Sequence, residues 1–152
     1  MPLLVTQQYT NGLGPTIPLI RDILGWNRED RMNDSLSMAD SPALSRSGAG
    51  KPYIEKLAFS CWGETEFRKA LKELKRKRVL LAGIETHICI LQTTIDLKQT
   101  GYTPVVIEHC TSSQRENEKR IALRRLHAEG ILISSYESIL FELMREAGDR
   151  DF

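Results

Sequence analysis

The sequence has few cysteines, no long apolar run and almost no net charge, and each of these shortages excludes a class of protein. The three cysteines, Cys61, Cys89 and Cys110, are odd in number and form no CxxC pair, which argues against a disulfide framework or a zinc site. The 21 basic and 20 acidic side chains nearly cancel, so no strong field favours a nucleic acid or an anionic membrane. These shortages predict a cytoplasmic protein with reduced thiols and with neither nucleic acid nor membrane as a partner.

The apolar residues are sufficient for a core but are too dispersed for a membrane span. No apolar run approaches the roughly 18 residues of a spanning helix, and "MPLLVTQQYT" lacks the basic region and long apolar core of a signal peptide. With 152 residues and 41% hydrophobic side chains, residues 1–152 are expected to form a single domain. The polar stretch 28–51 has weak periodicity and predicts a long loop.

Short apolar runs alternate with amphipathic segments along the chain, which is typical of the α/β class with a mostly parallel sheet. Apolar side chains at helical spacing predict helices over 64–77 and 116–129. Ser113 with Glu116, and Ser134 with Glu137, have the spacing of capping boxes. The predicted strands are 2–6, 53–59, 78–84, 103–110 and 130–136.

Cys89 lies where a strand gives way to a helix. The strand that ends near Gly83 is followed by Thr86, whose hydroxyl is expected to cap the helix and leave first-turn N–H groups for a ligand. A helix N-terminus favours a thiolate over a thiol, and ligands of open α/β sheets bind at the carboxyl ends of strands. The alternative is that Cys89 is a small buried hydrophobic residue.

Lys56 is a charged residue inside the apolar run "YIEKLAF". A strand covered on both faces tolerates a charge only at its end or in a site, so Lys56 is either a strand-end lysine or functional. A cation brought close to Cys89 would favour the thiolate and give an activated nucleophile.

The stretch "GIETHICILQTTIDLKQTGYTPVVIEHCTSSQ" resembles the nucleophile region of the isochorismatase-like cysteine hydrolases, the family of nicotinamidase and N-carbamoylsarcosine amidase. The upstream stretches "IEKLAFSCWGETEFRKAL" and "VTQQYTNGLGPTIPLI" resemble the catalytic-lysine strand of that family and the strand and Gly-Pro loop before it. The resemblance covers nearly the whole chain apart from the polar loop. It implies a Rossmann-like, three-layer α/β/α fold.

The resemblance also implies a reaction and the residues that carry it. Cys89 matches the nucleophile, which would form a thioester with a small amide, imide, ureide or related carbonyl substrate, and Lys56 matches the lysine that would stabilise the thiolate. Backbone N–H groups of Glu85 and Cys89 would hold the oxyanion, next to a cis peptide bond between Ile84 and Glu85. No metal and no other cofactor is expected, and family members commonly form homo-oligomers.

Other candidates have weaker support from the sequence. Tyr9, Phe59 and Trp62 would border the substrate, together with the helix start at Thr86, although packing in the core explains these aromatic residues equally well. His87 is expected to pack or to line the site rather than to act as a base.

The chain departs from the family pattern at the third member of the triad. In the family, an Asp ends an earlier, central strand, which would lie between 2–6 and 78–84; neither Asp22 nor Asp30 follows a strand. The absence fits an amino-terminally truncated hydrolase, a sheet whose remaining strands close up, or a gap filled by another chain. Three functions therefore stay open: a hydrolase, a non-catalytic family member that binds or assembles, and a redox-sensing thiol.

Truncation would explain both the missing Asp and the missing strand. We therefore expect the DNA upstream of the Met1 codon to encode, in frame, roughly 30–40 further residues with a strand ending in Asp and a helix, the size of one βα unit. Sequencing of that DNA tests this, and an immediately preceding stop codon would contradict it.

Overall fold

The structure is a computed structural model that describes residues 2–23 and 53–148. It divides into two compact units, Met1–Lys75 and Arg76–Phe152, and each is described by itself. The predicted loop at 28–51 lies outside the described residues. Among the helices that the structure does describe, none is long and apolar enough to cross a membrane.

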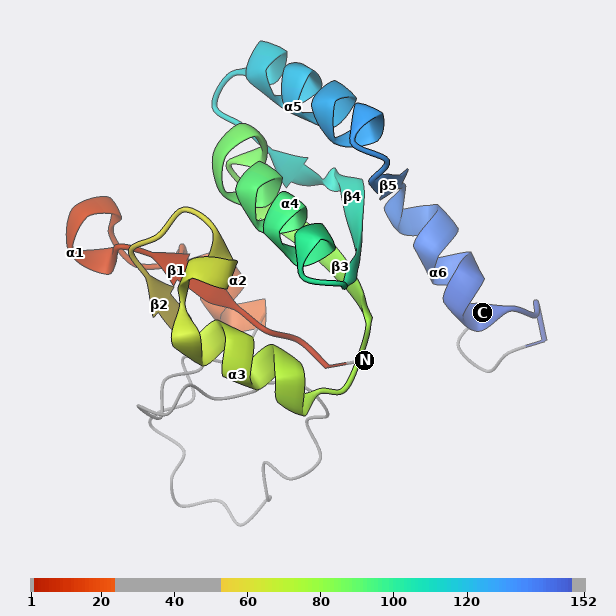
Figure 1. Ribbon diagram of the computed structural model, residues 1–152, viewed down its shortest axis with the longest axis horizontal. Helices are drawn as coiled ribbons and strands as arrows, with labels where there is room; N and C mark the ends of the chain where they lie inside the picture. The colour runs from red at the N-terminus through yellow and green to blue at the C-terminus, as the bar shows by residue number, and fades with distance from the viewer. Residues whose placement is uncertain (1, 24–52, 149–152) are drawn as a thin grey trace. The chain divides into compact units, whose positions relative to one another are not determined.

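The first unit contains two short parallel strands and the helices that follow them (Figure 1). The strands pair in the register Thr6↔Ile54, Gln7↔Glu55 and Gln8↔Lys56. Its elements are β1 (Thr6–Gln8), α1 (Thr10–Leu13), α2 (Pro18–Ile23), β2 (Ile54–Lys56), a 3₁₀ turn (Cys61–Gly63) and α3 (Thr65–Glu73).

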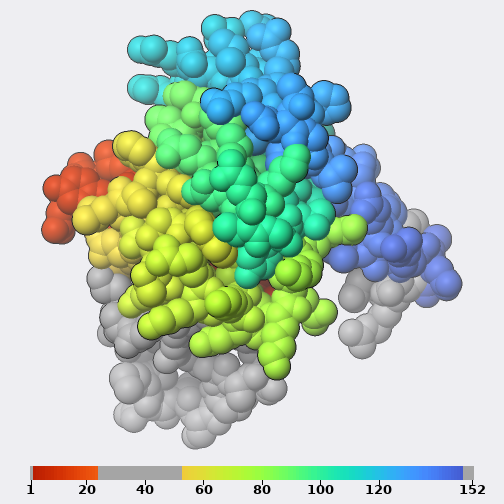
Figure 2. Space-filling view, in the orientation of Figure 1, coloured from red at the N-terminus to blue at the C-terminus, as the bar shows by residue number. Residues whose placement is uncertain are grey.

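The second unit contains a three-stranded parallel sheet in the order β3–β4–β5. Helices α4 and α5 contact each other, and both contact β4; Figure 2 shows them side by side at the surface. Its elements are β3 (Arg78–Ile84), a π-helical turn (Thr86–Ile90), α4 (Leu91–Gln99), β4 (Thr103–Ser112), α5 (Glu116–Ala128), β5 (Leu132–Ser134) and α6 (Tyr136–Met144).

Apolar side chains at helical spacing bury one face of α3 and one face of α5, as the sequence predicts. On α3 the buried residues are Phe67, Ala70 and Leu71. The core of the second unit has Leu126 and Val106 at its centre, both with no exposed surface. The remaining buried members of this core are Ile90, Leu123 and Ile131.

The α/β class with parallel strands is confirmed, and β3 matches its predicted bounds. The capping predictions are wrong. Ser135, not Ser134, caps α6 by accepting from the N–H of Ser138 at 3.0 Å. Helix α5 has no side-chain cap: its N-cap residue is Arg115, and the Ser113 hydroxyl accepts from the distant backbone N–H of Thr86.

The pairing of β3 with β4 contains a bulge. Leu81 pairs with Val106, whereas Gly83 pairs with Thr111, so β4 places residues 107–110 opposite Ala82 alone. Gly83 has φ 136°, a conformation that residues with a Cβ rarely adopt. Beyond the bulge, Ile84 pairs with Ser112, and the carboxyl ends of both strands therefore finish next to each other.

The described strands form two separate sheets, β1–β2 and β3–β4–β5, and no pairing joins β1 to β3 among them. The resemblance to the family places a further strand between these two, and a sheet whose remaining strands close up was one of the alternatives left open; the described strands do not pair in that way.

Candidate functional site

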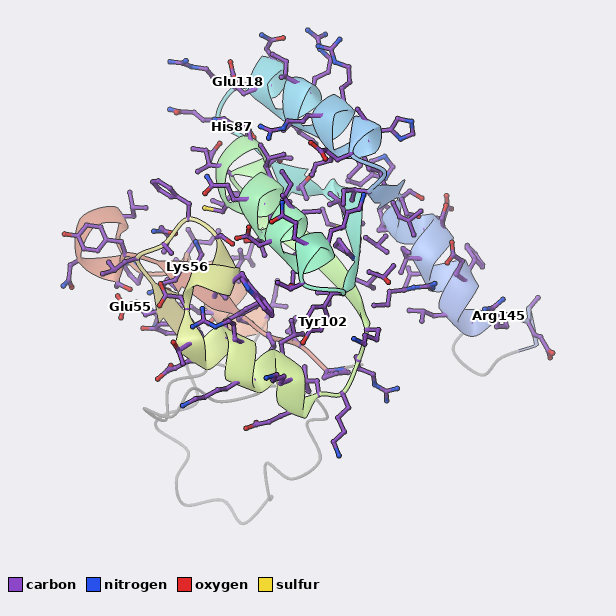
Figure 3. All side chains as sticks on the ribbon, in the orientation of Figure 1. Glu55, Lys56, His87, Tyr102, Glu118 and Arg145 are labelled. Carbon is purple, nitrogen blue, oxygen red and sulfur yellow. The ribbon has the colours of Figure 1, made fainter. Side chains whose placement is uncertain are left out.

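Lys56 is buried at the end of β2 with 4% of its surface exposed (Figure 3). Its Nζ donates to the Gln8 side-chain oxygen, to the carbonyl O of Ala58 at 3.1 Å and to that of Phe59 at 2.8 Å. These three acceptors match the three N–H bonds of an ammonium group. The first unit therefore holds a buried positive charge in a fixed position at a strand end.

The turn after β2 supplies two of those acceptors and is itself held by side chains. Glu64 Oε1 accepts from the N–H of Leu57 at 3.0 Å and of Ala58 at 3.2 Å. Ser60 Oγ accepts from the N–H of Trp62 at 3.2 Å. Side-chain hydrogen bonds thus hold the turn around Ala58 and Phe59, the two residues whose carbonyls accept from the ammonium.

The predicted aromatic residues of the first unit lie around the same strand end. The N–H of Tyr9 donates to the carbonyl O of Lys56 at 2.9 Å, and Tyr9 has φ 35°. A Cβ on Gly12 would lie 2.2 Å from Tyr9 Cε1, so only glycine leaves room for the tyrosine ring where it lies. Tyr9 is 47% and Phe59 54% exposed, whereas Trp62 is half-buried, so Tyr9 and Phe59 are available to a ligand.

Cys89 belongs to the π-helical turn that connects β3 to α4, as predicted for a thiol at a helix start. The carbonyl O of Glu85 accepts from the N–H groups of Ile88 and Ile90, both at 3.2 Å. π-Helical turns are rare and occur frequently at functional sites. The thiol is half-buried, and Cys110 is exposed.

The Ile84–Glu85 peptide bond is cis, which confirms the prediction made from the resemblance. The oxyanion-binding role of the backbone N–H groups of Glu85 and Cys89 stays a prediction.

The prediction that Thr86 caps the helix through its hydroxyl is wrong. Glu85 is the N-cap residue, no side chain caps the turn, and the Thr86 hydroxyl donates to the carbonyl O of Ser112 at 2.9 Å. Thr86 is fully buried against the end of β4, where a hydroxyl needs an acceptor. Its side chain therefore holds the turn to the sheet.

A polar cluster that the sequence analysis missed joins this turn to the end of β4. Ser113 Oγ accepts from the N–H of Thr86 at 3.1 Å and lies 3.1 Å from His87 Nδ1. Glu85 Oε2 lies 3.3 Å from the same nitrogen, and the Glu85 carboxylate also accepts from the N–H of Gln114. A carboxylate has no proton to give, so this contact favours the tautomer with the hydrogen on Nδ1.

The structure thus brings together Tyr9, Lys56, Phe59 and Trp62 in one unit, and Glu85, Thr86 and Cys89 in the other. The pairing of Lys56 with Cys89 involves both units and stays a prediction. Among the described residues, no group of three or more His, Cys, Asp or Glu side chains could hold a metal ion.

The arrangement of helices and parallel strands is that of the isochorismatase-like hydrolase fold, which solved structures share. The Isochorismatase domain family model matches residues 1–138, and the chain belongs to the isochorismatase family.

Two curated relatives match the chain along its whole length. Isochorismatase family protein 1B of Dictyostelium discoideum is 30% identical over 152 residues, which is 100% of this chain and 64% of the relative. The secreted isochorismatase effector Isc1 of Phytophthora sojae is 33% identical over 153 residues, which is 100% of this chain and 63% of the relative. The chain therefore spans just under two thirds of the length of these relatives.

Solved structures share the fold. The MAR1 ribonuclease of Caenorhabditis elegans matches with a TM-score of 0.75 and 26% identity, over 100% of this chain and 66% of that one. The nicotinamidase PncA of Bacillus subtilis matches with a TM-score of 0.52 and 26% identity, over 55% of this chain and 46% of that one.

Replacement of Ser113 by alanine should destabilise the second unit. Ser113→Ala removes the acceptor of a buried backbone N–H, which should lower the free energy of unfolding by about 1–3 kcal/mol. Ser112→Ala is the matched control, because only the backbone carbonyl of Ser112 accepts from Thr86 and its side chain is exposed. Urea unfolding of the two variants should separate them, and equal midpoints would show that the Ser113 hydroxyl does not hold the turn.

Proposed function

We propose that the protein is a cysteine hydrolase that acts on a small amide, imide, ureide or related carbonyl substrate through a thioester intermediate. The observation that carries the proposal is the position of Cys89 in the first helical turn after a parallel strand. The buried Lys56 ammonium, whose position is fixed by three acceptors, supports it as a second strand-end group of the kind the reaction needs. The resemblance to the family's motifs is the basis for matching Cys89 with the nucleophile and Lys56 with the lysine, and membership of the isochorismatase family supports this match.

The reaction divides one difficult hydrolysis into two steps. The Cys89 thiolate attacks the carbonyl carbon and forms a C–S bond; the C–N bond then breaks, and the leaving amine takes a proton. Water next attacks the thioester, which releases the acid and regenerates the thiol. Lys56 stabilises the thiolate, and the backbone N–H groups of Glu85 and Cys89 hold the oxyanion. In the family an Asp takes and returns the protons, and no residue of this chain is assigned to that role.

Tyr9 and Phe59 are the side chains that we propose border the substrate, because both are exposed beside the Lys56 strand end. Trp62 and the backbone of the turn that begins at Thr86 are the other groups that we propose border the substrate. A small molecule is favoured over RNA, despite the ribonuclease name of one structural neighbour, because the 21 basic and 20 acidic side chains give no cationic field.

We further propose a homo-oligomer in the cytoplasm. Helix α6 leaves apolar side chains exposed at helical spacing, Tyr136, Leu140 and Leu143, while Ile139 is buried. Three thiols without a disulfide among them suit a reducing compartment.

Cys89 should be the most reactive thiol of the protein. Limiting iodoacetamide at neutral pH should label Cys89 before Cys61 and Cys110, as located by peptide mass spectrometry. Accessibility alone would favour the exposed Cys110, so the expected order reports thiolate character rather than exposure. Lys56→Met should slow the labelling of Cys89 about tenfold, because it removes the proposed cation. Preferential labelling of Cys110 would contradict the assignment of the nucleophile.

Hydrolysis should depend on Cys89 alone among the three thiols. The complete gene product should be incubated with small primary amides, imides and ureides, with a short RNA as a separate arm. For the substrate that is hydrolysed, Cys89→Ser should lower kcat about 10³-fold or more, and Cys110→Ser should leave it unchanged. Acid quenching should trap the acyl group on Cys89 as a mass increase. A folded protein that hydrolyses none of the amides would favour the non-catalytic alternative, and RNA cleavage would identify a different substrate class.

A further inference from the structure

Gln8 and Lys56 face each other across the two parallel strands of the first unit. They are Cα partners in the β1–β2 register, at the carboxyl end of each strand. Residues paired in this way project their side chains to the same face of the sheet. The structure therefore places a long neutral amide next to the buried ammonium.

The Gln8 amide has one determined orientation. Gln8 Nε2 donates to the carbonyl O of Leu57 at 2.8 Å, which only the NH₂ end of the amide can do. Gln8 Oε1 consequently faces Lys56 and accepts from its Nζ. One side chain thus contacts both the ammonium and the turn directly after it.

Gln8 is also the only side chain among the three acceptors described for the ammonium. The other two are the carbonyl oxygens of Ala58 and Phe59, in the turn held by Glu64. Substitutions cannot remove these backbone oxygens, whereas a substitution of Gln8 removes one of the three acceptors.

The neutrality of the amide has a chemical consequence. A carboxylate at this position would also accept from the ammonium, but its negative charge would cancel most of the field that Lys56 exerts on its surroundings. An amide contributes an acceptor without a charge. The Gln8 amide can therefore fix the ammonium in place without adding a negative charge beside it.

We propose that Gln8 is a positioning residue for Lys56: its neutral amide holds the ammonium where it stabilises the Cys89 thiolate, and adds no negative charge of its own. The inference rests on the proposed function, in which Lys56 and Cys89 act together.

The test is the second-order rate of Cys89 alkylation by iodoacetamide, measured from neutral to alkaline pH in the complete gene product. Gln8→Met keeps the length of the side chain and removes both hydrogen bonds. It should slow alkylation at neutral pH about fivefold to tenfold and leave the limiting rate at high pH unchanged. Gln8→Glu should slow it at least as much, because it keeps the acceptor but adds the cancelling charge.

A double-mutant cycle separates positioning from a structural role. If Gln8 acts through Lys56, Gln8→Met should have no further effect on alkylation in a Lys56→Met background. Gln99→Met is the matched control for the chemical change, because Gln99 is exposed at the end of α4. Urea unfolding should accompany each variant; if Gln8→Met does not fold, Gln8→Glu and the cycle built on it replace it.

The outcomes distinguish this inference from the proposed function. Slow alkylation in Lys56→Met with normal alkylation in both Gln8 variants would overturn the role of Gln8 and leave the proposed function intact. Additive effects of Gln8→Met and Lys56→Met would likewise overturn it, as a structural effect. Normal alkylation in Lys56→Met would remove the role of Lys56 itself, and the inference with it.

Discussion

Burial of the Lys56 ammonium is the constraint on which the arrangement of the first unit depends. An unpaired buried charge costs far more free energy than a small unit can provide, so acceptors must surround it. Two of these are carbonyls of the turn after β2, and the third comes from Gln8 on the neighbouring strand. Pairing of the two short strands keeps Gln8 beside the ammonium. Glu64 holds the tight turn, and the turn keeps the two carbonyl acceptors in place.

The second unit also contains a buried residue whose polar groups need hydrogen-bond partners, but here all the groups are neutral. The chain reverses between β3 and α4 through a turn whose first residue, Thr86, is fully buried. Its N–H and its hydroxyl both find partners at the end of β4, in Ser113 and the Ser112 carbonyl. Cys89 lies in that same turn, so these hydrogen bonds of Thr86 help to fix the backbone that carries the thiol.

The sequence predicts the elements well and their ends poorly. Apolar spacing correctly identifies the buried faces of α3 and α5, and β3 lies where its apolar run predicts. The Ser113 box and the Thr86 cap were wrong because capping rules consider only neighbours in sequence, whereas the Ser134 box was one residue away from the actual cap, Ser135. The Thr86 hydroxyl donates to the carbonyl O of Ser112, 26 residues away, and no local sequence pattern indicates such a contact.

For the candidate site, the roles predicted for the residues stay predictions. Spacing and charge drew attention to Cys89 and Lys56, and the resemblance to a family added the cis peptide bond, which is present. The hydrogen bonds of Gln8 and of the Glu85–His87–Ser113 cluster were missed, because polar residues near strand ends are common and their partners depend on the strand register.

The bulge in β4 lies between two parts of the strand that have different structural roles. Before residues 107–110, β4 pairs with β3 through apolar residues that build the core; after them, Ser112 and Ser113 hold the turn that contains the thiol. Because the registers with β3 and β5 give no partner to residues 108–110, a change of length within these three can be absorbed without altering the pairing of the core-building half. The two halves of the strand can therefore evolve under separate selection, one for stability and the other for chemistry.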